Sequence, residues 1–102
     1  MRIVKPATVE VYVEQHRDAA SWLRRWVEAV KAAEWASLED VRKTYPHADA
    51  TKVASGATVT IFNVKGNKYR LIVSIHYNTG RVFVRDFLTH AEYDAERWKE
   101  RH

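Results

Sequence analysis

Thr58-Val59-Thr60-Ile61-Phe62-Asn63-Val64, followed by an alternating segment over residues 68–77, decides the fold of this chain. The first stretch is rich in β-branched residues, which favour strands. Lys65-Gly66-Asn67 lies between the two segments and has the composition of a turn. Since side chains alternate along a strand, the second segment has one face of Tyr69, Leu71, Val73 and Ile75 and an opposite face of Lys68, Arg70, Ile72, Ser74 and His76. The two segments therefore predict an antiparallel hairpin.

Two further strands extend this hairpin. Asn78-Thr79-Gly80 predicts a second turn, and residues 81–87 predict a third strand. In that strand Val82 and Val84 point one way, and Arg81, Phe83, Arg85 and Phe87 point the other way. Residues 2–5 are also expected to form a short strand.

Helices are predicted before the hairpin. Apolar residues recur at three- and four-residue steps over 18–33, which indicates an amphipathic helix that Asp18 can cap. Residues 7–15 fit either a strand, through alternating Val9, Val11 and Val13, or a helix that begins after Pro6. The residues alone do not decide between the two.

Two more helices are expected, at residues 37–45 and 90–100. Ser37-Leu38-Glu39-Asp40 has the pattern of a capping box, and Pro46 ends the helix that follows. Thr89 can cap the last helix, whose large apolar residues are Tyr93 and Trp98. The 102 residues are thus expected to form one α+β domain, 1–102, with helices on one face of a mostly antiparallel sheet.

Composition narrows the possible functions. The chain has no cysteine, which excludes disulfides, thiol nucleophiles and thiolate metal sites. The net charge is +4, and residues 65–90 carry five basic side chains against one acidic side chain. This local excess is typical of a surface that binds nucleic acid, although a solvated basic face would look the same. The N-terminus has no apolar signal region, and no apolar run is long enough to span a membrane, so a cytoplasmic protein is expected.

RNA cleavage without a metal needs only a few of these residue types. A base removes the 2′-hydroxyl proton, cations stabilise the charge that develops on the phosphate, and an acid protonates the leaving oxygen. Arg70 is the strongest candidate, because a guanidinium matches phosphate geometry and a mid-strand arginine is costly unless it has a partner. The alternative for Arg70 is a surface ion pair. Lys68, expected on the same face, would meet a phosphate or merely solubilise the strand end.

His90 and Tyr93 are candidates for proton transfer. They lie three residues apart at the start of the last predicted helix, and a helix start attracts anions. Taken singly, His90 fits a structural histidine and Tyr93 fits a core residue; their combination with Arg70 favours the catalytic interpretation. Asn63, Lys65 and Arg85 are expected to bind RNA alongside Lys68. The alternative for Asn63, at the end of its strand, is that it simply starts the turn.

Other chemistries lack support in the sequence. No H-E-x-x-H, P-loop or dinucleotide-binding motif is present, and the five histidines are scattered. We therefore expect neither a metal nor a cofactor.

Two signatures in the chain resemble those of HigB-type toxins, members of the wider RelE-like class. They are the stretch Ile61-Phe62-Asn63-Val64-Lys65-Gly66-Asn67-Lys68-Tyr69-Arg70-Leu71-Ile72 and the later Thr89-His90-Ala91-Glu92-Tyr93-Asp94. Met1-Arg2-Ile3, Trp35, Ser37, Asp40-Val41-Arg42 and Tyr45-Pro46-His47-Ala48 are also similar to the family. The resemblance runs over about residues 1–94.

The resemblance implies a small sheet backed by N-terminal helices, with residues 6–16 helical. It implies a toxin that cleaves messenger RNA on the ribosome, inhibited by a HigA-type antitoxin with a helix-turn-helix domain that binds operator DNA. Arg70 and Tyr93 match the strand arginine and late tyrosine of RelE-like toxins, and His90 falls where these toxins often carry a basic side chain. Asn63 stands where some members have lysine. The alternative functions are a module that binds RNA or the ribosome without cutting and a scaffold whose basic surface meets an acidic partner.

Overall fold

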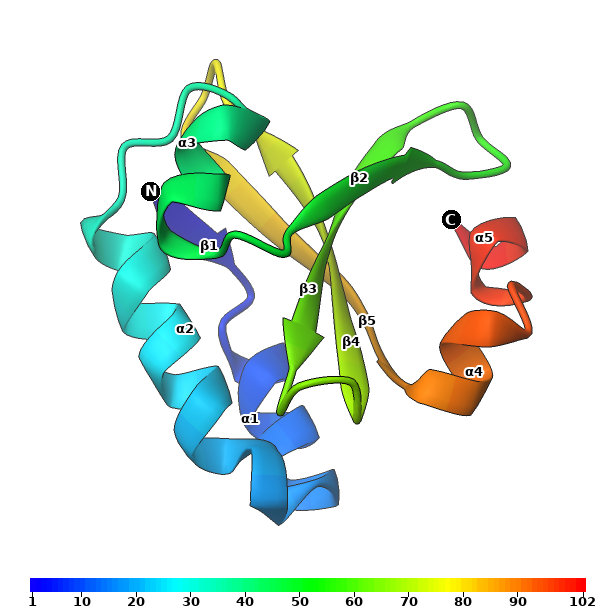
Figure 1. Ribbon diagram of the computed structural model, residues 1–102. Helices are drawn as coiled ribbons and strands as arrows, with labels where there is room; N and C mark the ends of the chain where they lie inside the picture. Colours follow the sequence, from blue (N-terminus) through cyan, green and yellow to red (C-terminus); the bar gives the residue numbers. More distant parts are fainter.

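A five-stranded sheet forms the centre of the molecule, as seen in a computed structural model that describes residues 1–102 (Figure 1). The strands run in the order β1-β5-β4-β3-β2. Their bounds are β1 Arg2–Val4, β2 Asp49–Lys52, β3 Thr58–Val64, β4 Tyr69–His76 and β5 Arg81–Thr89. Neighbouring strands are antiparallel, except that β1 pairs with β5 in parallel. The predicted hairpin is confirmed, and β4 is the central strand.

Helices cover both faces of this sheet. They are α1 Ala7–Gln15, α2 Ala20–Ala32, α3 Leu38–Thr44, α4 His90–Asp94 and α5 Trp98–Arg101, with a 3₁₀ turn over Arg17–Ala19. Figure 1 shows α1, α2 and α3 on one side of the strands and the two C-terminal helices on the other. The expected α+β class is therefore confirmed. The expectation that all helices lie on one face is wrong, because Trp98 of α5 packs on the face opposite the main core.

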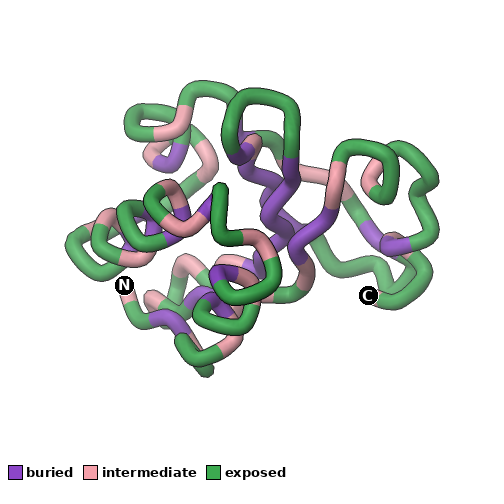
Figure 2. The backbone as a smooth tube through the Cα atoms, turned by 90° about the horizontal axis from the view of Figure 1, so that it is seen from below, coloured by how far each residue is buried: buried purple, intermediate pink, exposed green.

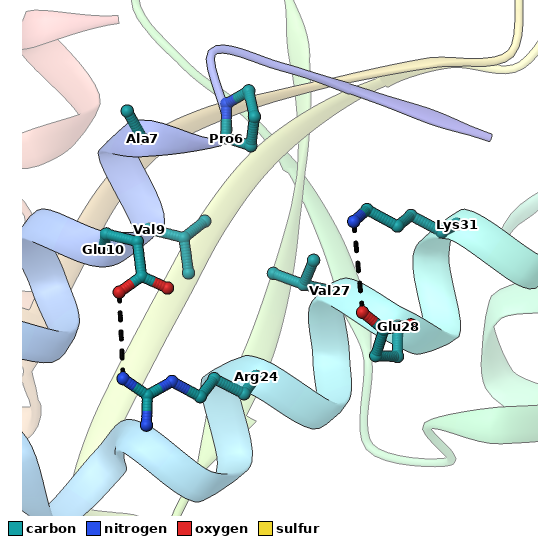
Figure 3. A pocket seen from close by; sticks show the side chains of 8 residues that line it. All are labelled: Pro6, Ala7, Val9, Glu10, Arg24, Val27, Glu28 and Lys31. Carbon is teal, nitrogen blue, oxygen red and sulfur yellow. Dashed lines mark ion pairs between the residues drawn. The ribbon is translucent and has the colours of Figure 1, made fainter.

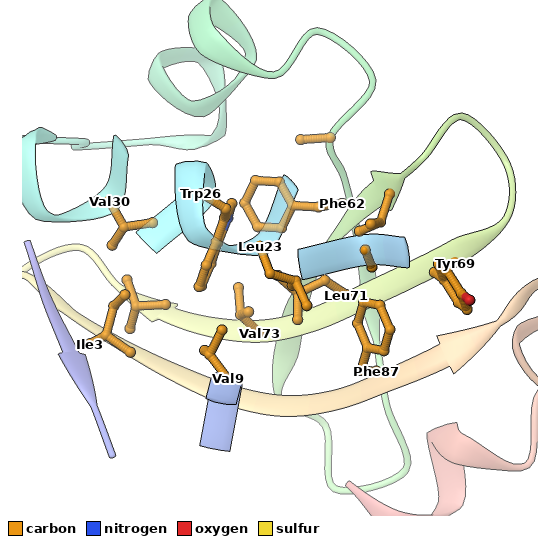
Figure 4. Packing of buried hydrophobic residues seen from close by; sticks show 14 of the residues in the cluster. Ile3, Val9, Leu23, Trp26, Val30, Phe62, Tyr69, Leu71, Val73 and Phe87 are labelled. Atoms are coloured by element: carbon orange, nitrogen blue, oxygen red, sulfur yellow. The ribbon is translucent and has the colours of Figure 1, made fainter. Parts of the chain in front are cut away.

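The main core fills the space between the N-terminal helices and the sheet. Leu23, Trp26 and Val30 of α2 are fully buried against Phe62, Leu71 and other strand residues (Figure 4). The tube in Figure 2 shows that the buried stretches concentrate in the middle of the molecule. Fully burying side chains of this size contributes about 1.5–3 kcal/mol each. A smaller cluster lies on the opposite face of the sheet, formed by Val53, Val59, Ile61, Ile72, Leu88 and Trp98.

The ambiguous segment 7–15 is helical, as the family resemblance implied. Val9 and Val13, four residues apart, are buried, whereas Val11 is 51% exposed. That burial follows helical spacing, so the strand interpretation of the alternating valines is wrong.

Two predicted helix caps are not formed. Asp18 lies in the 3₁₀ turn and does not cap α2, because its carboxylate accepts hydrogen bonds from Lys68 and Tyr69 instead. Ser37 precedes α3, yet its hydroxyl makes no capping bond; the Asp40 carboxylate accepts the N–H of Ala36 at 2.9 Å. At Asp18, partners from a distant strand replace the predicted cap. Before α3, a carboxylate within the helix accepts a backbone N–H, and the predicted cap residue does not.

A β-bulge corrects the predicted faces of β5. Ile72 pairs with Asp86, and the next β4 residue, Val73, pairs with Val84, so Arg85 is an extra residue in β5. The bulge returns Phe87 to the side of Val82 and Val84, where it joins the main core. The sequence alternation had placed Phe87 on the opposite side.

Two further corrections concern chain segments. The strand β2 was not predicted, because Asp49-Ala50-Thr51-Lys52 has no large apolar residue and pairs only as an edge strand. The single helix expected over 90–100 is broken in two, since Glu96 has a left-handed backbone with φ of 61°. This break lets Trp98 fold back onto the sheet.

Candidate active site

Arg70 is the second residue of the central strand β4 and lies on the face opposite the main core. Its register partners are Asn63 on β3 and Leu88 on β5. Only 8% of the residue is exposed. One terminal guanidinium nitrogen donates to the Tyr69 carbonyl at 3.1 Å, and the other donates to Asn67 Oδ1 at 3.3 Å.

No ion pair of the structure includes Arg70. Asp86 of β5 pairs with Arg101, and Asp94 of α4 pairs with His90. A buried charge normally needs an opposite charge or a full set of hydrogen bonds. A guanidinium has five N–H donors, and protein acceptors engage it through only two hydrogen bonds. Arg70 is therefore suited to bind an external anion, and its planar fork fits a phosphate.

Tyr93 lies against this arginine. The guanidinium carbon of Arg70 is 5.3 Å from the centroid of the Tyr93 ring, within the range of a cation–π contact. Tyr93 is carried by α4, whose start is held by the predicted Thr89 cap. Thr89 Oγ1 accepts the Glu92 N–H at 3.2 Å, and the Glu92 carboxylate accepts the Thr89 N–H at 3.0 Å. The capping box therefore fixes the direction in which α4 leaves β5.

His90 begins α4 and is exposed. Its Nε2 lies 3.1 Å from Asp94 Oδ2, so the partner of the ring is the Asp94 carboxylate. Its backbone N–H donates to the Lys68 carbonyl at 3.1 Å and fixes α4 to the end of the β3–β4 hairpin. The structure thus places His90 on the same short helix as Tyr93 but gives it a different side-chain partner.

A polar hollow adjoins Arg70. It is lined by His47, Asn63, Gly66 and Asn67. Asn67 also accepts the bond from Arg70, and Asn63 faces Arg70 across the strands. His47 was not among the residues selected from the sequence as site candidates; its only signal there was its place in one of the family-like stretches. Lys65 is exposed in the adjoining turn with a left-handed φ of 53°.

Lys68 does not share the face of Arg70, contrary to the prediction. β4 begins at Tyr69, and the Lys68 ammonium turns to the face that the N-terminal helices cover, where it pairs with Asp18. The Tyr69 hydroxyl donates to the same carboxylate at 2.8 Å. These hydrogen bonds, first from Lys68 and then from Tyr69, lower the pKa of Asp18, and the bond to Asp18 raises the pKa of Lys68. Burial raises the pKa of the Tyr69 hydroxyl.

Arg85 also lies apart from Arg70. Its Nε donates to Ser74 Oγ at 3.0 Å, and its guanidinium lies 5.4 Å from the Phe83 ring. Ser74 is four residues beyond Arg70 on β4, which corresponds to roughly 13 Å along a strand. The structure therefore brings Arg70, Tyr93 and Asn63 together, with Lys65 and His90 at the margin, and leaves Lys68 and Arg85 outside this group.

A second hollow, between α1 and α2, has a different character (Figure 3). Val9 and Val27 form its floor, and surface ion pairs edge it, with Arg24–Glu10 at 3.8 Å and Lys31–Glu28 at 3.9 Å. It lies on the face of the sheet that the N-terminal helices cover, and it shares no residue with the Arg70 site. No three His, Asp or Glu side chains are grouped so as to hold a metal ion. None of the helices has the length and apolarity needed to cross a membrane.

The central sheet and the N-terminal helices packed on it have the architecture of a RelE-like toxin. Residues 19–96 match the HigB toxin family, described as the RelE-like toxic component of a toxin-antitoxin system, and the chain belongs to that family. It is also similar to the mRNA interferase HigB of Escherichia coli O6:H1 (strain CFT073). The two are 29% identical over 94 residues, which cover 92% of this chain and 89% of that relative.

Proposed function

We propose that this toxin, with residues 1–102 acting as one domain, is an mRNA interferase that cuts messenger RNA on the ribosome without a metal ion. The observation that carries the proposal is Arg70, a buried guanidinium without a carboxylate partner, set against the Tyr93 ring. The relative named mRNA interferase supports the same activity.

The proposed reaction is an attack by the ribose 2′-hydroxyl on the adjacent phosphorus. A base takes the 2′-hydroxyl proton, the bond from O2′ to phosphorus forms, and the bond from phosphorus to O5′ breaks. An acid protonates O5′, which leaves a cyclic phosphate and a free 5′-hydroxyl. The free N–H groups of Arg70 stabilise the negative charge that builds on the phosphate oxygens. His90 and Tyr93 share the acid and base roles, in an order that the residues do not assign.

RNA would be bound from both sides of Arg70. Asn63 and Lys65 line or adjoin the polar hollow and are suited to contact the nucleotide beside the scissile phosphate. Lys68 and Arg85 lie farther away and would meet phosphates elsewhere along the RNA. Contacts of this kind make the affinity fall steeply with salt.

The partners follow from membership of a toxin-antitoxin family. We propose a HigA-type helix-turn-helix antitoxin that neutralises the toxin, binds operator DNA and connects the toxin to it. The proposed place of action is the cytoplasm, where ribosomes and messenger RNA are found.

The test is a bacterial translation extract programmed with a reporter mRNA and examined by primer extension. We expect new 5′ ends inside the coding region with the wild-type protein, with or without chelator. Arg70→Ala and Tyr93→Phe should lose them. Arg81→Ala is the matched control, because it removes an exposed positive charge at the opposite end of β5 from Thr89 and should cut normally.

Two outcomes would contradict the proposal. If translation stops while the message stays intact, the chain is an RNA- or ribosome-binding module that does not cut. If Arg70→Ala and Tyr93→Phe both cut like the wild type, RNA cleavage does not use this site.

A further inference from the structure

The last six residues of the chain lie beyond the family match, which ends at Glu96. The sequence predicts a single helix over residues 90–100, which includes the first four of these six residues. The left-handed backbone at Glu96 instead turns the chain back, so that α5 lies beside the sheet on the face that carries Arg70 and Tyr93 (Figure 1). This segment is therefore placed to act on the candidate site.

Trp98 is the anchor of that segment. It is 1% exposed and packs in the small cluster on this face of the sheet with Val53, Val59, Ile61, Ile72 and Leu88. A tryptophan buried so fully on such a short helix is held by packing against the sheet, because a helix of four residues has little stability of its own.

Two contacts connect Trp98 to Tyr93. Their rings stack with centroids 5.4 Å apart and planes 17° from parallel. The Trp98 Nε1–H donates to the Tyr93 carbonyl at 3.0 Å. One residue thus holds both the ring and the backbone of Tyr93, while the other neighbour of that ring is the Arg70 guanidinium.

Three residues after Trp98 hold the C-terminal segment against the rest of the molecule. The Ala54 N–H, after β2, donates to the Lys99 carbonyl at 2.9 Å. At the chain end, Arg101 and His102 approach Asp86 Oδ2 of β5 at 2.6 Å and 3.2 Å. The residues that follow Trp98 are therefore attached to the turn after β2 and to β5.

We propose that Trp98 is a positioning residue for RNA cleavage, which holds the Tyr93 ring against Arg70 in the geometry that the reaction needs. This inference rests on the proposed function, because Tyr93 must take part in cleavage for its position to matter. Trp98 itself does not touch RNA. Its loss should therefore slow the chemical step and leave RNA binding almost unchanged.

The experiment compares Trp98→Leu and Trp98→Phe with Val53→Ala. Val53 packs in the same cluster but belongs to no part of the proposed site, so its truncation reproduces the loss of stability alone. For each full-length protein, the maximal cleavage rate and the protein concentration that gives half of it are measured. The position of Tyr93 is followed separately by fluorine NMR of protein labelled with fluorotyrosine, without RNA, and its signal among the five tyrosines is assigned with Tyr93→Phe.

We expect Trp98→Leu to lower the maximal rate about 10- to 100-fold, as misplacement of a reacting group by about 1 Å does. The half-saturating concentration should not change, and the Tyr93 signal should move. Trp98→Phe keeps a ring that can stack on Tyr93 and lacks the N–H donor, so its maximal cleavage rate should fall about fivefold. Val53→Ala should unfold at lower urea and yet keep both the rate and the Tyr93 signal.

Three results would overturn the inference: a normal rate in Trp98→Leu, an unmoved Tyr93 signal in that variant, or an equal rate loss in Val53→Ala. Normal cleavage by Tyr93→Phe would instead contradict the catalytic role of Tyr93 in the proposed function. The NMR measurement, made without RNA, separates the two failures.

Discussion

The guanidinium of Arg70 lies 5.3 Å from the ring centroid of Tyr93, although one residue is in the central strand and the other is in a helix that follows the next strand. In the proposed mechanism, this pair joins the group that binds the phosphate to a hydroxyl that transfers a proton. The guanidinium donates hydrogen bonds to two carbonyl oxygens, one from the Tyr69 backbone and one from the Asn67 side chain, and to no carboxylate. The site thus holds a positive charge at a cost that only an anionic ligand would offset.

Replacement of this arginine should separate stability from activity. Arg70→Met keeps most of the volume and removes a buried charge without an ion-pair partner. We expect the free energy of unfolding to stay the same or rise by about 1 kcal/mol, since apolar replacement of buried charges is often stabilising. Cleavage should fall by about 10²–10³-fold, as when an oxyanion-stabilising donor is removed.

Urea unfolding and cleavage assays on the same preparations check this. Leu71→Ala, next to Arg70 but in the main core, is the contrast, and should lose about 2–5 kcal/mol. A large loss of stability in Arg70→Met would mean that the guanidinium is a structural group.

A non-cleavable RNA should stabilise the folded protein through the same arginine. With 2′-O-methyl RNA at 100 times its Kd, linkage predicts about 2.7 kcal/mol of added stability. Thermal unfolding should therefore shift upward for the wild type and for Arg81→Ala, and much less for Arg70→Met. An equal shift in all three proteins would place RNA binding away from Arg70.

The Asp18 carboxylate should make stability depend on acid pH. Hydrogen bonds from Lys68 and Tyr69 lower its pKa in the folded protein below the ordinary 3.8. The unfolded chain then binds more protons, so the Asp18 contribution is fully present above pH 3.8 and is lost as the pH falls through the folded value.

Asp18→Asn should therefore unfold at lower urea than the wild type at neutral pH, with the difference shrinking below pH 3.8. Urea midpoints measured over this pH range for both proteins provide the check. Glu14→Gln, whose carboxylate pairs only with exposed Arg17, should follow the wild-type curve. A constant difference between wild type and Asp18→Asn at every pH would contradict the ion-pair explanation.

Trp26 should tolerate loss of its indole N–H. This nitrogen is buried and has no hydrogen-bond partner, while the ring packs edge-on against Phe62 at 5.7 Å. Neither variant loses a hydrogen bond, so the two should differ in packing alone. Trp26→Phe keeps a ring against Phe62 and should cost less than Trp26→Ala, which should lose about 3–5 kcal/mol. Urea unfolding of both variants tests this, and equal losses would show that ring size, not ring type, is decisive.

Much of the fold could be predicted because its strands have clear local patterns. The β-branched run 58–64 matches β3 residue for residue, and the capping box at Thr89 forms as expected. Local patterns failed where a distant partner intervened. Asp18 accepts a hydrogen bond from Lys68 and does not cap α2. One extra residue in β5, Arg85, places Phe87 on the other face of the strand. A bulge depends on the pairing of two strands, so neither strand alone reveals it.

The candidate site was predictable in its members more than in its grouping. Arg70 could be selected because it is an arginine within a predicted strand, on the face opposite the apolar residues. Tyr93 could be selected because it belongs to the closing family-like signature. Lys68 was grouped with them because strand alternation was extended past the true start of β4. Arg85 was grouped with them because alternation predicts a face and not the position along it, and Arg85 contacts Ser74, four residues from Arg70 on β4. His47 reaches the polar hollow from a loop, and loop residues carry no periodicity that points to a site.

By itself, the sequence determined the α+β class, the central hairpin, the amphipathic α2 and the basic residues suited to a phosphate, because each depends on contacts close along the chain. Only the tertiary structure decided that Lys68 pairs with Asp18, that Phe87 joins the core, and that Trp98 returns to hold Tyr93 against Arg70. Those results depend on which distant groups compete for the same hydrogen bond or apolar surface. Such a competition is settled only when all elements pack together.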